Sequence, residues 1–370
     1  MSIFENIGGT IKEQACYGYA NLNFLLAFNN KEMEKKFLER VYPFINKSNK
    51  CDSIDFELNI TIDDVLYKIL SKKQFNGNEF EEVIVSYCSK ESGMVRAKKC
   101  YVDNHIFIKT SRECGFWIID NTFKKIVFVG NQDCIEHFHR EFYVFFEHVL
   151  VKKAEEKGAI LLHAAAVEKE GRVILLMGKK RSGKTTTFFE LCKYGGCVPL
   201  SVDKILLVPE NEEYMVYGVP TRLRVLSGTL SKYKELYHFI PDKYKNVSQE
   251  VLWRGQSDGK VEIPIGEFEK FIKKEFRIRG VLKTIVFNQV LQSEDYYKLS
   301  LGLGNDSEKI LLENIFSPFN PEEDWWSEIG IRKVEQINDL RDEMIEILKQ
   351  KIQFINYRTQ KDFTALINTL

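Results

Sequence analysis

The stretch "GKKRSGKT" at residues 178–185 combines residue types whose spacing suits phosphate binding. Gly178, Gly183, Lys184 and Thr185 satisfy the pattern G-x-x-x-x-G-K-[ST], which in nucleotide-binding proteins follows a strand and begins a helix. Glycines let the backbone curl so that successive N–H groups point inward, and a helix N-terminus adds partial positive charge. The stretch therefore predicts a cradle for a polyphosphate.

The chemistry expected of this loop is the binding of ATP together with Mg²⁺. The Lys184 ammonium would reach the β- and γ-phosphates, and the Thr185 hydroxyl would bind Mg²⁺. The other residues expected to contact the nucleotide are Lys179, Lys180, Arg181, Ser182 and Thr186. The alternative is a lysine-rich, solvated turn that only caps a helix. The apolar run "VILLM" before the loop and the helical pattern after it favour the phosphate-binding site.

Asp203 is the acid that we expect to work beside this loop. It lies nineteen positions after Lys184, on the strand predicted to return from the helix of the loop. We predict that it binds Mg²⁺ and acts as the general base of phosphoryl transfer. The alternative is an acid at the end of a strand that caps a turn. The GTPase signatures N-K-x-D and D-x-x-G do not occur, and the apolar run "KTIVF" leads into Asn288 rather than an acid.

The elements that position these residues follow from the hydrophobic pattern. From Ala159 the order is strand, glycine-rich loop, helix and strand, which is α/β order. An amphipathic helix is expected from about Val334 to Lys351, and a final helix ends at Leu370. The first half of the chain is different, because short β-rich runs separated by polar turns predict a β-meander there. These runs are 56–62, 81–88, 94–102, 105–110, 115–120 and 124–130.

We therefore predict two domains. Residues 1–150 would form a β-rich N-terminal domain that ends in a connector helix, within the apolar stretch 134–158. Residues 151–370 would form the α/β domain that carries the phosphate-binding loop. Equal numbers of basic and acidic residues, 53 of each, argue against nucleic acid or a membrane surface as a partner.

The location that we expect is cytoplasmic. The N-terminal residues do not have the basic and apolar order of a signal peptide, and no stretch has the length of a membrane span. The eight cysteines form no C-x-x-C pair and are expected to be reduced. Whether the chain assembles as a homo-oligomer is left open.

Residues 159–225 resemble the catalytic domain of the HPr serine kinase/phosphorylase family. The similar segments are "LHAAAV", the loop "GKKRSGKTT", "FFELCKYGGCVPLSVDKILLV" and "YGVPTRLRV", in that order. The pattern is most similar to the peptide kinases of the family, such as those that phosphorylate lasso-peptide precursors. The resemblance implies a P-loop, HPr-kinase-like domain with a mixed sheet and flanking helices, preceded by a smaller β-rich domain.

The resemblance also implies roles for single residues. His163 matches a histidine that this family places on the strand before the loop, and Asp203 matches the acid proposed as general base. The alternative for His163 is a satisfied core residue. Val202 stands where the family usually has a second acid, and Thr186 stands where the bifunctional enzymes have Glu, so reverse phosphorylase activity is not expected.

Two arginines are candidates for contacts with the acceptor or the phosphate. Arg222, with Arg224, would share one face of a strand, and Arg279 ends a basic run before the next strand. The alternative for both is a solvated surface. Trp325 and Trp326 in an acidic loop are candidates for a peptide contact or, more simply, for packing.

These observations lead to a kinase hypothesis. The chain would transfer the γ-phosphoryl group of ATP to a serine-type hydroxyl of a protein or precursor peptide. One alternative is a non-kinase ATP-binding or ATPase module whose nucleotide state controls a protein interaction. Another is a kinase for the hydroxyl of a small molecule.

Overall fold

The computed structural model defines two compact units within the chain. Unit 1 consists of Met1–Ile160 and Ser317–Asp342, and unit 2 consists of Leu161–Phe316 and Glu343–Leu370. The residues that the structure describes are 14–48, 53–75, 80–86, 95–102, 104–110, 113–254, 260–290, 297–317, 334–359 and 363–370. Trp325 and Trp326 lie outside these ranges.

The units differ from the expected domains in their boundary and in their size. The expected boundary after residue 150 falls inside helix α5 (Val144–Glu156), whereas unit 1 extends to Ile160 and includes the later segment 317–342. Helices that pack on a sheet belong to its core, so α5 stays with the strands that precede it. The two units are of similar length, whereas a smaller N-terminal domain was expected.

The described residues of unit 1 form a nine-stranded mixed sheet in the order β3-β1-β2-β4-β9-β8-β7-β6-β5. The strands are β1 Ala15–Tyr19, β2 Leu22–Phe28, β3 Asn46–Lys47, β4 Phe56–Ile62, β5 Glu81–Ser86, β6 Val95–Val102, β7 His105–Thr110, β8 Gly115–Asp120 and β9 Lys125–Gly130. The antiparallel run from β5 to β9 confirms the predicted meander. β4 is also a strand but pairs in parallel with β2 and β9. The connection from β2 to β4 carries helix α2 (Lys31–Val41), and α3 (Asp64–Phe75) begins the longer connection from β4 to β9.

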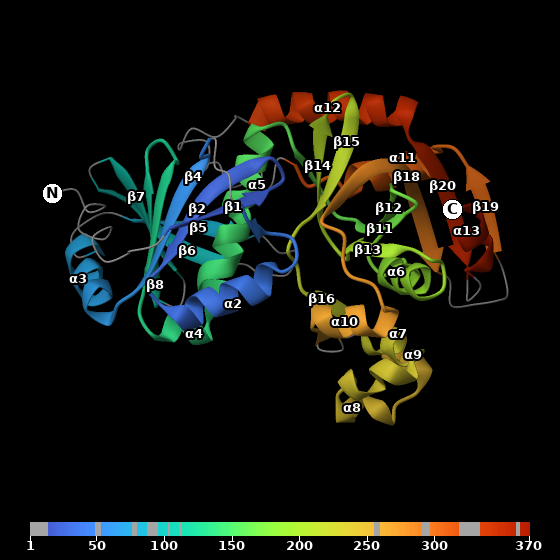
Figure 1. The fold of residues 1–370 in the computed structure, drawn as a ribbon, viewed down its shortest axis with the longest axis horizontal. Helices are drawn as coiled ribbons and strands as arrows, with labels where there is room; N and C mark the ends of the chain where they lie inside the picture. Colours follow the sequence, from blue (N-terminus) through green and yellow to red (C-terminus); the bar gives the residue numbers. More distant parts are fainter. Residues whose placement is uncertain are drawn as a thin grey trace. The chain divides into compact units, whose positions relative to one another are not determined.

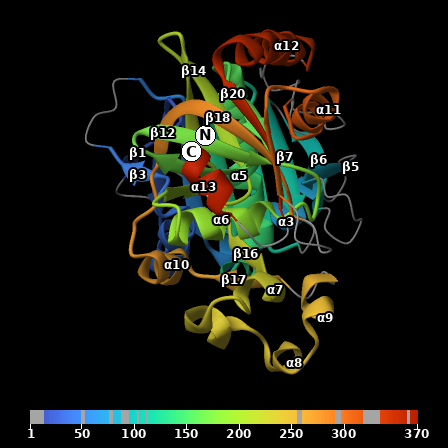
Figure 2. The same cartoon turned by 90° about the vertical axis from the view of Figure 1, so that its right-hand side faces the viewer.

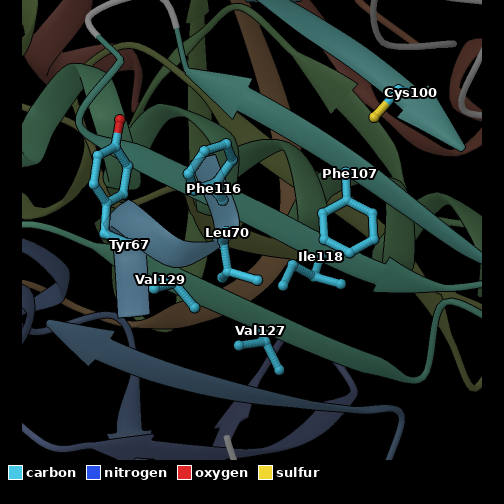
Figure 3. Close-up of a cluster of buried hydrophobic side chains, with 8 residues drawn as sticks. All are labelled: Tyr67, Leu70, Cys100, Phe107, Phe116, Ile118, Val127 and Val129. Atoms are coloured by element: carbon cyan, nitrogen blue, oxygen red, sulfur yellow. The ribbon is translucent and has the colours of Figure 1, made fainter. Parts of the chain in front are cut away.

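Helices cover both faces of this sheet. On one face, Tyr67 and Leu70 of α3 pack with side chains of β6, β7, β8 and β9 in a buried cluster (Figure 3). On the other face, Trp117 of β8 stacks on Phe145 of α5, with ring centroids 4.3 Å apart, and Phe37 of α2 (Lys31–Val41) packs on Phe146. Adjacent strand residues point to opposite faces, so one strand supplies both cores.

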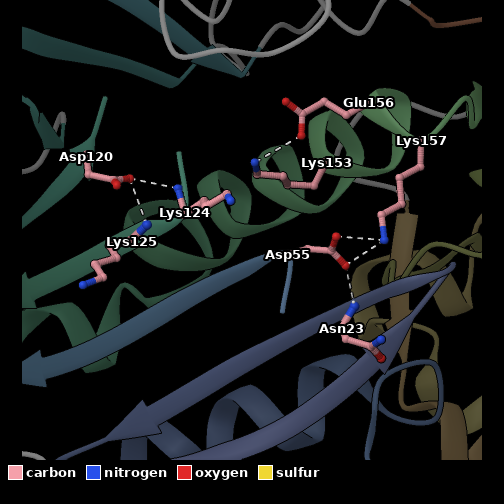
Figure 4. Close-up of polar contacts among 8 residues, drawn as sticks. All are labelled: Asn23, Asp55, Asp120, Lys124, Lys125, Lys153, Glu156 and Lys157. Atoms are coloured by element: carbon pink, nitrogen blue, oxygen red, sulfur yellow. Dashed lines mark hydrogen bonds and ion pairs between the residues drawn. The ribbon is translucent and has the colours of Figure 1, made fainter. Parts of the chain in front are cut away.

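The predicted connector helix is not continuous. It consists of a short α4 (Asp133–Glu136), a π-helical turn (His139–Tyr143) and α5. Polar contacts tie the end of α5 to the sheet of unit 1 (Figure 4). Lys157 Nζ lies 2.8 Å from Asp55 Oδ1, and Asp55 Oδ2 accepts a hydrogen bond from Asn23 N at 2.8 Å. Asp120 closes the β8–β9 turn by accepting from the backbone N–H groups of Lys124 and Lys125.

Unit 2 has a second mixed sheet, in the order β10-β14-β15-β18-β12-β11-β13, with β20 beside β18 and β19 beside β20 (Figure 1). Its strands are β10 Ile160–Leu162, β11 Ala165–Lys169, β12 Arg172–Met177, β13 Val198–Ser201, β14 Ile205–Glu210, β15 Glu213–Gly218, β18 Arg279–Val290, β19 Tyr297–Leu301 and β20 Gln353–Thr359. β12, β18 and β20 are parallel to one another. The antiparallel pairs are β11–β12, β11–β13, β14–β15, β15–β18 and β19–β20. The predicted mixed sheet with flanking helices is therefore present in unit 2.

Helix α6 (Lys184–Lys193) packs on this sheet, and smaller elements pack on α6 (Figure 2). Phe189 of α6 lies 4.7 Å from Phe268 of α10 (Ile265–Ile272), measured between ring centroids. A two-stranded ribbon of β16 (Leu223–Leu226) and β17 (Lys260–Ile263) leads into this region. The other helices of the described residues in unit 2 are α7 Ser227–Leu230, the 3₁₀ turn Lys234–Phe239, α8 Asp242–Lys245, α9 Gln249–Arg254, α11 Asn305–Glu313 and α13 Thr364–Thr369. The boundary between the units falls within α12 (Val334–Lys351).

Helix α12 has the predicted range, and α13 is the predicted final helix. Within the described ranges, no helix has both the length and the apolar character needed to cross a membrane. Among the described residues, five cysteines are free thiols, namely Cys100, Cys114, Cys134, Cys192 and Cys197. Cys16 is disulfide-bonded, which differs from the expectation that the cysteines are reduced.

Candidate phosphate-binding and catalytic site

The loop 178–183 connects β12 to α6, so the strand and the helix lie where the sequence predicted them. Gly183 has a φ of 87° and Arg181 a φ of 68°, both in the left-handed region. A Cβ atom on Gly183 would lie 2.3 Å from Cγ2 of Val290, and one on Gly178 would lie 2.8 Å from the backbone oxygen of Asn288. Both glycines of the motif are therefore required by the close approach of the end of β18.

The loop sits at the carboxyl ends of two parallel strands. β12 pairs with β18 in parallel, with Met177 opposite Phe287, so that the loop after Met177 meets the residues after Phe287. In sheets of this kind, ligands bind outside the carboxyl ends of the strands. The N-terminus of α6 opens at the same place and contributes its partial positive charge.

Lys184 lies over the loop that precedes it. Its Nζ donates hydrogen bonds to the backbone oxygens of Gly178, at 2.8 Å, and Lys179, at 3.4 Å. Burial lowers the pKa of Lys184 to about 8, the charge of Asp203 opposes this shift, and the charge of Lys260 adds to it. A phosphate would supply the negative charge that this desolvated ammonium lacks.

The three threonines that begin α6 have different environments. Thr185 is half-buried, and its hydroxyl has no hydrogen-bonding partner among the described side chains. Thr186, expected to contact the nucleotide, is 3% exposed, and its hydroxyl lies 3.0 Å from Thr229 Oγ1 of α7. It therefore attaches α7 to α6 and does not face the loop. Thr187 is fully buried and accepts a hydrogen bond from Asn288.

Asp203 and His163 form a pair in unit 2. His163 Nε2 lies 3.3 Å from Asp203 Oδ1, with 29% of the histidine side chain and 53% of the aspartate side chain exposed. Both residues were expected on strands, but His163 lies between β10 and β11, and Asp203 lies in the bend between β13 and β14. The backbone N–H of His163 donates to the Asn314 oxygen at 2.8 Å, and its ring packs against Phe316.

His163 and two lysines lower the pKa of Asp203. Burial raises the pKa of the carboxyl group, but the hydrogen bond and charge of His163, with the charges of Lys204 and Lys260, lower it to about 2. Asp203 is therefore ionised at neutral pH. Because its charge also acts on the pKa of Lys184, the carboxylate lies within electrostatic reach of the loop lysine.

The two predicted arginines are held by other partners. Arg222 NH1 lies 2.8 Å from Glu262 Oε2 across the β16–β17 ribbon. Arg279 begins β18, donates to the Tyr217 hydroxyl at 2.9 Å and is 3.9 Å from Glu210. At about 3.3 Å per residue, the length of β18 separates it from Asn288 by about 30 Å. Arg279 therefore lies at the end of the strand away from the loop and does not contribute to the site.

Two residues of the site were not predicted from sequence. Lys260 begins β17, opposite Leu226, and its charge lowers the pKa of both Lys184 and Asp203. Asn288 was noted only for its lack of a carboxylate, yet its side chain contacts the loop. A single lysine at the start of a strand and a single buried amide have no sequence signature, so only the tertiary structure identifies them as residues of the site.

The residues present fit a Mg²⁺–nucleotide complex. The Thr185 hydroxyl and the ionised Asp203 carboxylate are hard oxygen ligands of the type that Mg²⁺ prefers. Among the described residues, no group of three or more His, Cys, Asp and Glu side chains could hold a metal ion. Mg²⁺ usually takes one or two protein oxygens and completes its shell with phosphates and water, so a sparse protein contribution suits it. The exposed Lys179, Lys180 and Arg181 lie on the loop itself.

This chain is similar to several solved structures, one of which is a bacterial kinase/phosphatase. The Hpr(Ser) kinase/phosphatase from Coxiella burnetii aligns with a TM-score of 0.23 and 12% identity, over 38% of this chain and 70% of that chain. No family model matches the sequence, and no curated protein matches it. A TM-score this low does not define a common fold.

Proposed function

We propose that this chain is an ATP-dependent kinase that phosphorylates a serine-type hydroxyl of a protein or precursor peptide. The observation that carries the proposal is that the His163–Asp203 pair and Lys184 belong to one unit, with the charge of Asp203 acting on the pKa of Lys184. Lys184 belongs to a loop with the backbone of a phosphate cradle, and the ionised Asp203, paired with His163, lies within electrostatic reach of that lysine. Phosphoryl transfer needs these elements, because it depends mainly on positioning and charge neutralisation.

Each group has a separate task in the proposed reaction. The loop amides and Lys184 bind and orient the phosphates, and the glycines keep side chains out of their way. Mg²⁺, when bound through Thr185 and Asp203, neutralises charge on the phosphates. His163 holds Oδ1 of Asp203, which leaves Oδ2 to accept a hydrogen bond from the acceptor hydroxyl. A carboxylate with a pKa of about 2 is a weak base, so Asp203 orients the hydroxyl and takes its proton late, when bond formation has made that proton acidic.

The same low pKa supports a second candidate function. A carboxylate that is ionised at every physiological pH is well suited to binding Mg²⁺ and nothing more. In that case the chain would be an ATP-binding or ATPase module whose nucleotide state controls a protein interaction. A kinase for small-molecule hydroxyls would use the same groups as the protein kinase.

Transfer of label from ATP separates these candidates. The protein would be incubated with γ-labelled ATP, Mg²⁺ and either a cell extract or peptides encoded beside its gene, with Lys184→Ala as the control. We expect label in a protein or peptide, at serine, in the wild type only. Label in a metabolite fraction would identify a small-molecule kinase. Release of free phosphate with no labelled acceptor would contradict the kinase and support the ATPase module.

A further inference from the structure

The side chain of Asn288 connects β18 to the phosphate-binding loop. Asn288 is 2% exposed, and its Nδ2 donates to the Ser182 backbone oxygen at 3.1 Å and to Thr187 Oγ1 at 3.2 Å. The backbone N–H of Val290 donates to the same Ser182 oxygen at 2.8 Å. One carbonyl of the loop is therefore held twice by the end of one strand.

The orientation of the Asn288 amide follows from its partners. A backbone carbonyl only accepts hydrogen bonds, so the NH₂ group must face Ser182. Asn288 Oδ1 then points elsewhere and, like Ser182 Oγ, is buried without a hydrogen-bonding partner among the described residues. A carboxylate at this position would place a second acceptor against the Ser182 oxygen and would bury a charge. Position 288 therefore requires a side chain that donates a hydrogen bond to the Ser182 oxygen, as an amide does and a carboxylate does not.

We infer that Asn288 is a positioning residue that keeps the loop in its phosphate-binding conformation before the nucleotide arrives. Two donor bonds from one buried side chain reach Ser182 in the loop and Thr187 in the first turns of α6. They fix the loop backbone relative to the N-terminus of α6. The backbone N–H groups of the loop and those of the first turn of the helix would then face the same phosphate. This preorganisation lowers the ordering cost of binding, so it should act on ATP affinity rather than on transfer. The kinetic part of the inference rests on the proposed function.

Substitutions of Asn288 test the donor role directly. Asn288→Asp keeps the size of the side chain but removes the donor, and we expect it to weaken Mg²⁺–ATP binding by about tenfold or more. At saturating ATP, kcat should stay within about threefold of the wild type, since the groups near the acceptor are unchanged. Gln289→Asp is the matched control, because it adds a carboxylate at the exposed neighbouring position of β18 and should change affinity less than twofold.

Two outcomes would overturn the inference. If the position served the metal, a carboxylate there would bind Mg²⁺–ATP as tightly as the wild type or more tightly, so equal or tighter binding by Asn288→Asp rejects the donor role. A fall in kcat with unchanged KM for ATP also rejects it, because Asn288 would then act in transfer. If Asn288→Asp does not fold, Thr187→Val removes one of the two bonds without changing β18, and a severalfold loss of affinity is expected.

Hydrogen exchange separates this inference from the kinase proposal. In the absence of nucleotide, the amides of Thr187 and Val290 should exchange faster in Asn288→Asp and Thr187→Val than in the wild type, while those of the unit 1 sheet should not change. Unchanged exchange would overturn the inference. If the wild type binds no ATP, the kinase proposal fails, whereas the exchange result still decides whether Asn288 holds the loop.

Discussion

His163 Nε2 lies 3.3 Å from Asp203 Oδ1. The two residues come together because β11 and β13 are antiparallel with Ala166 opposite Ser201, so the residues just before β11 lie opposite those just after β13. β10 pairs with β14, and β11 pairs with β13, so the β10–β11 and β13–β14 connections face each other. Because the two residues lie in connections and not within strands, both side chains are partly exposed. His163 thereby holds the Asp203 carboxylate in one position. The position of the pair is therefore determined by the strand pairing of unit 2.

Asp203→Asn distinguishes a base from a metal ligand. The amide keeps the shape of the side chain and one oxygen that can bind Mg²⁺, but it cannot accept a proton. We therefore expect acceptor phosphorylation to fall by about 10² or more while ATP binding is nearly unchanged. The measurement is transfer and ATP affinity over a Mg²⁺ titration. Asp242→Asn, which removes an exposed acid on α8, is the control and should have no effect. Recovery of transfer at high Mg²⁺ would contradict the role as base.

His163→Ala should change the pH dependence of transfer at its acidic side. Without the hydrogen bond and charge of His163, the pKa of Asp203 rises from about 2, because burial is then less opposed. As the pH falls, the variant therefore loses its active, ionised carboxylate at a higher pH than the wild type does. We expect transfer to decline in the variant under acidic conditions that the wild type tolerates. An identical acidic limb in both proteins would exclude this coupling.

ATP affinity should weaken as the pH rises through about 8, the pKa of Lys184 in the nucleotide-free protein. Protonated Lys184 is the form that binds phosphate, so deprotonation above this value costs affinity, up to tenfold for each further pH unit. Lys184→Arg stays charged and should show a nearly flat profile, even if its affinity is lower. Calorimetric titration from pH 7 to pH 9.5 makes the comparison. A flat wild-type profile would count against the assignment.

Lys260→Met should shift the same profile to higher pH. The charge of Lys260 lowers the pKa of Lys184, so its removal allows Lys184 to hold its proton longer. Lys270→Met, on the exposed face of α10, removes one charge elsewhere in unit 2 and is the control. We expect the pH at which ATP affinity declines to rise in Lys260→Met and to stay unchanged in Lys270→Met. A shift of equal size in the control would mean that net charge, and not proximity, is responsible.

Gly183→Ala should abolish phosphate binding through a steric clash. The added Cβ meets Val290 Cγ2 at 2.3 Å, and the positive φ adds about 1 kcal/mol of strain. Gly196→Ala has a comparable φ of 75° but no atom within 4 Å, so it measures the strain alone. We expect Gly183→Ala to lower the free energy of unfolding by about 1–3 kcal/mol more than the control. Val290→Ala should partly restore the variant, and no restoration would argue against the clash.

Local chemistry made much of unit 2 predictable from its sequence. The loop 178–183, the strand before it and helix α6 follow from glycine spacing and hydrophobic period, which act over a few residues. The meander from β5 to β9 follows for the same reason, because its strands pair with their neighbours in the chain. The parallel pairing of β4 did not, since both of its partners are distant in sequence.

The composition of the site was decided by tertiary pairing. The parallel register of β12 and β18 brings Asn288 to the loop and leaves Arg279 at the other end of the same strand. The ribbon of β16 and β17 brings the charge of Lys260 to the site while Arg222 is neutralised by Glu262. A motif records which residues are close along the chain. Which distant strands become neighbours depends on how a whole sheet buries its faces, and no short pattern contains that information.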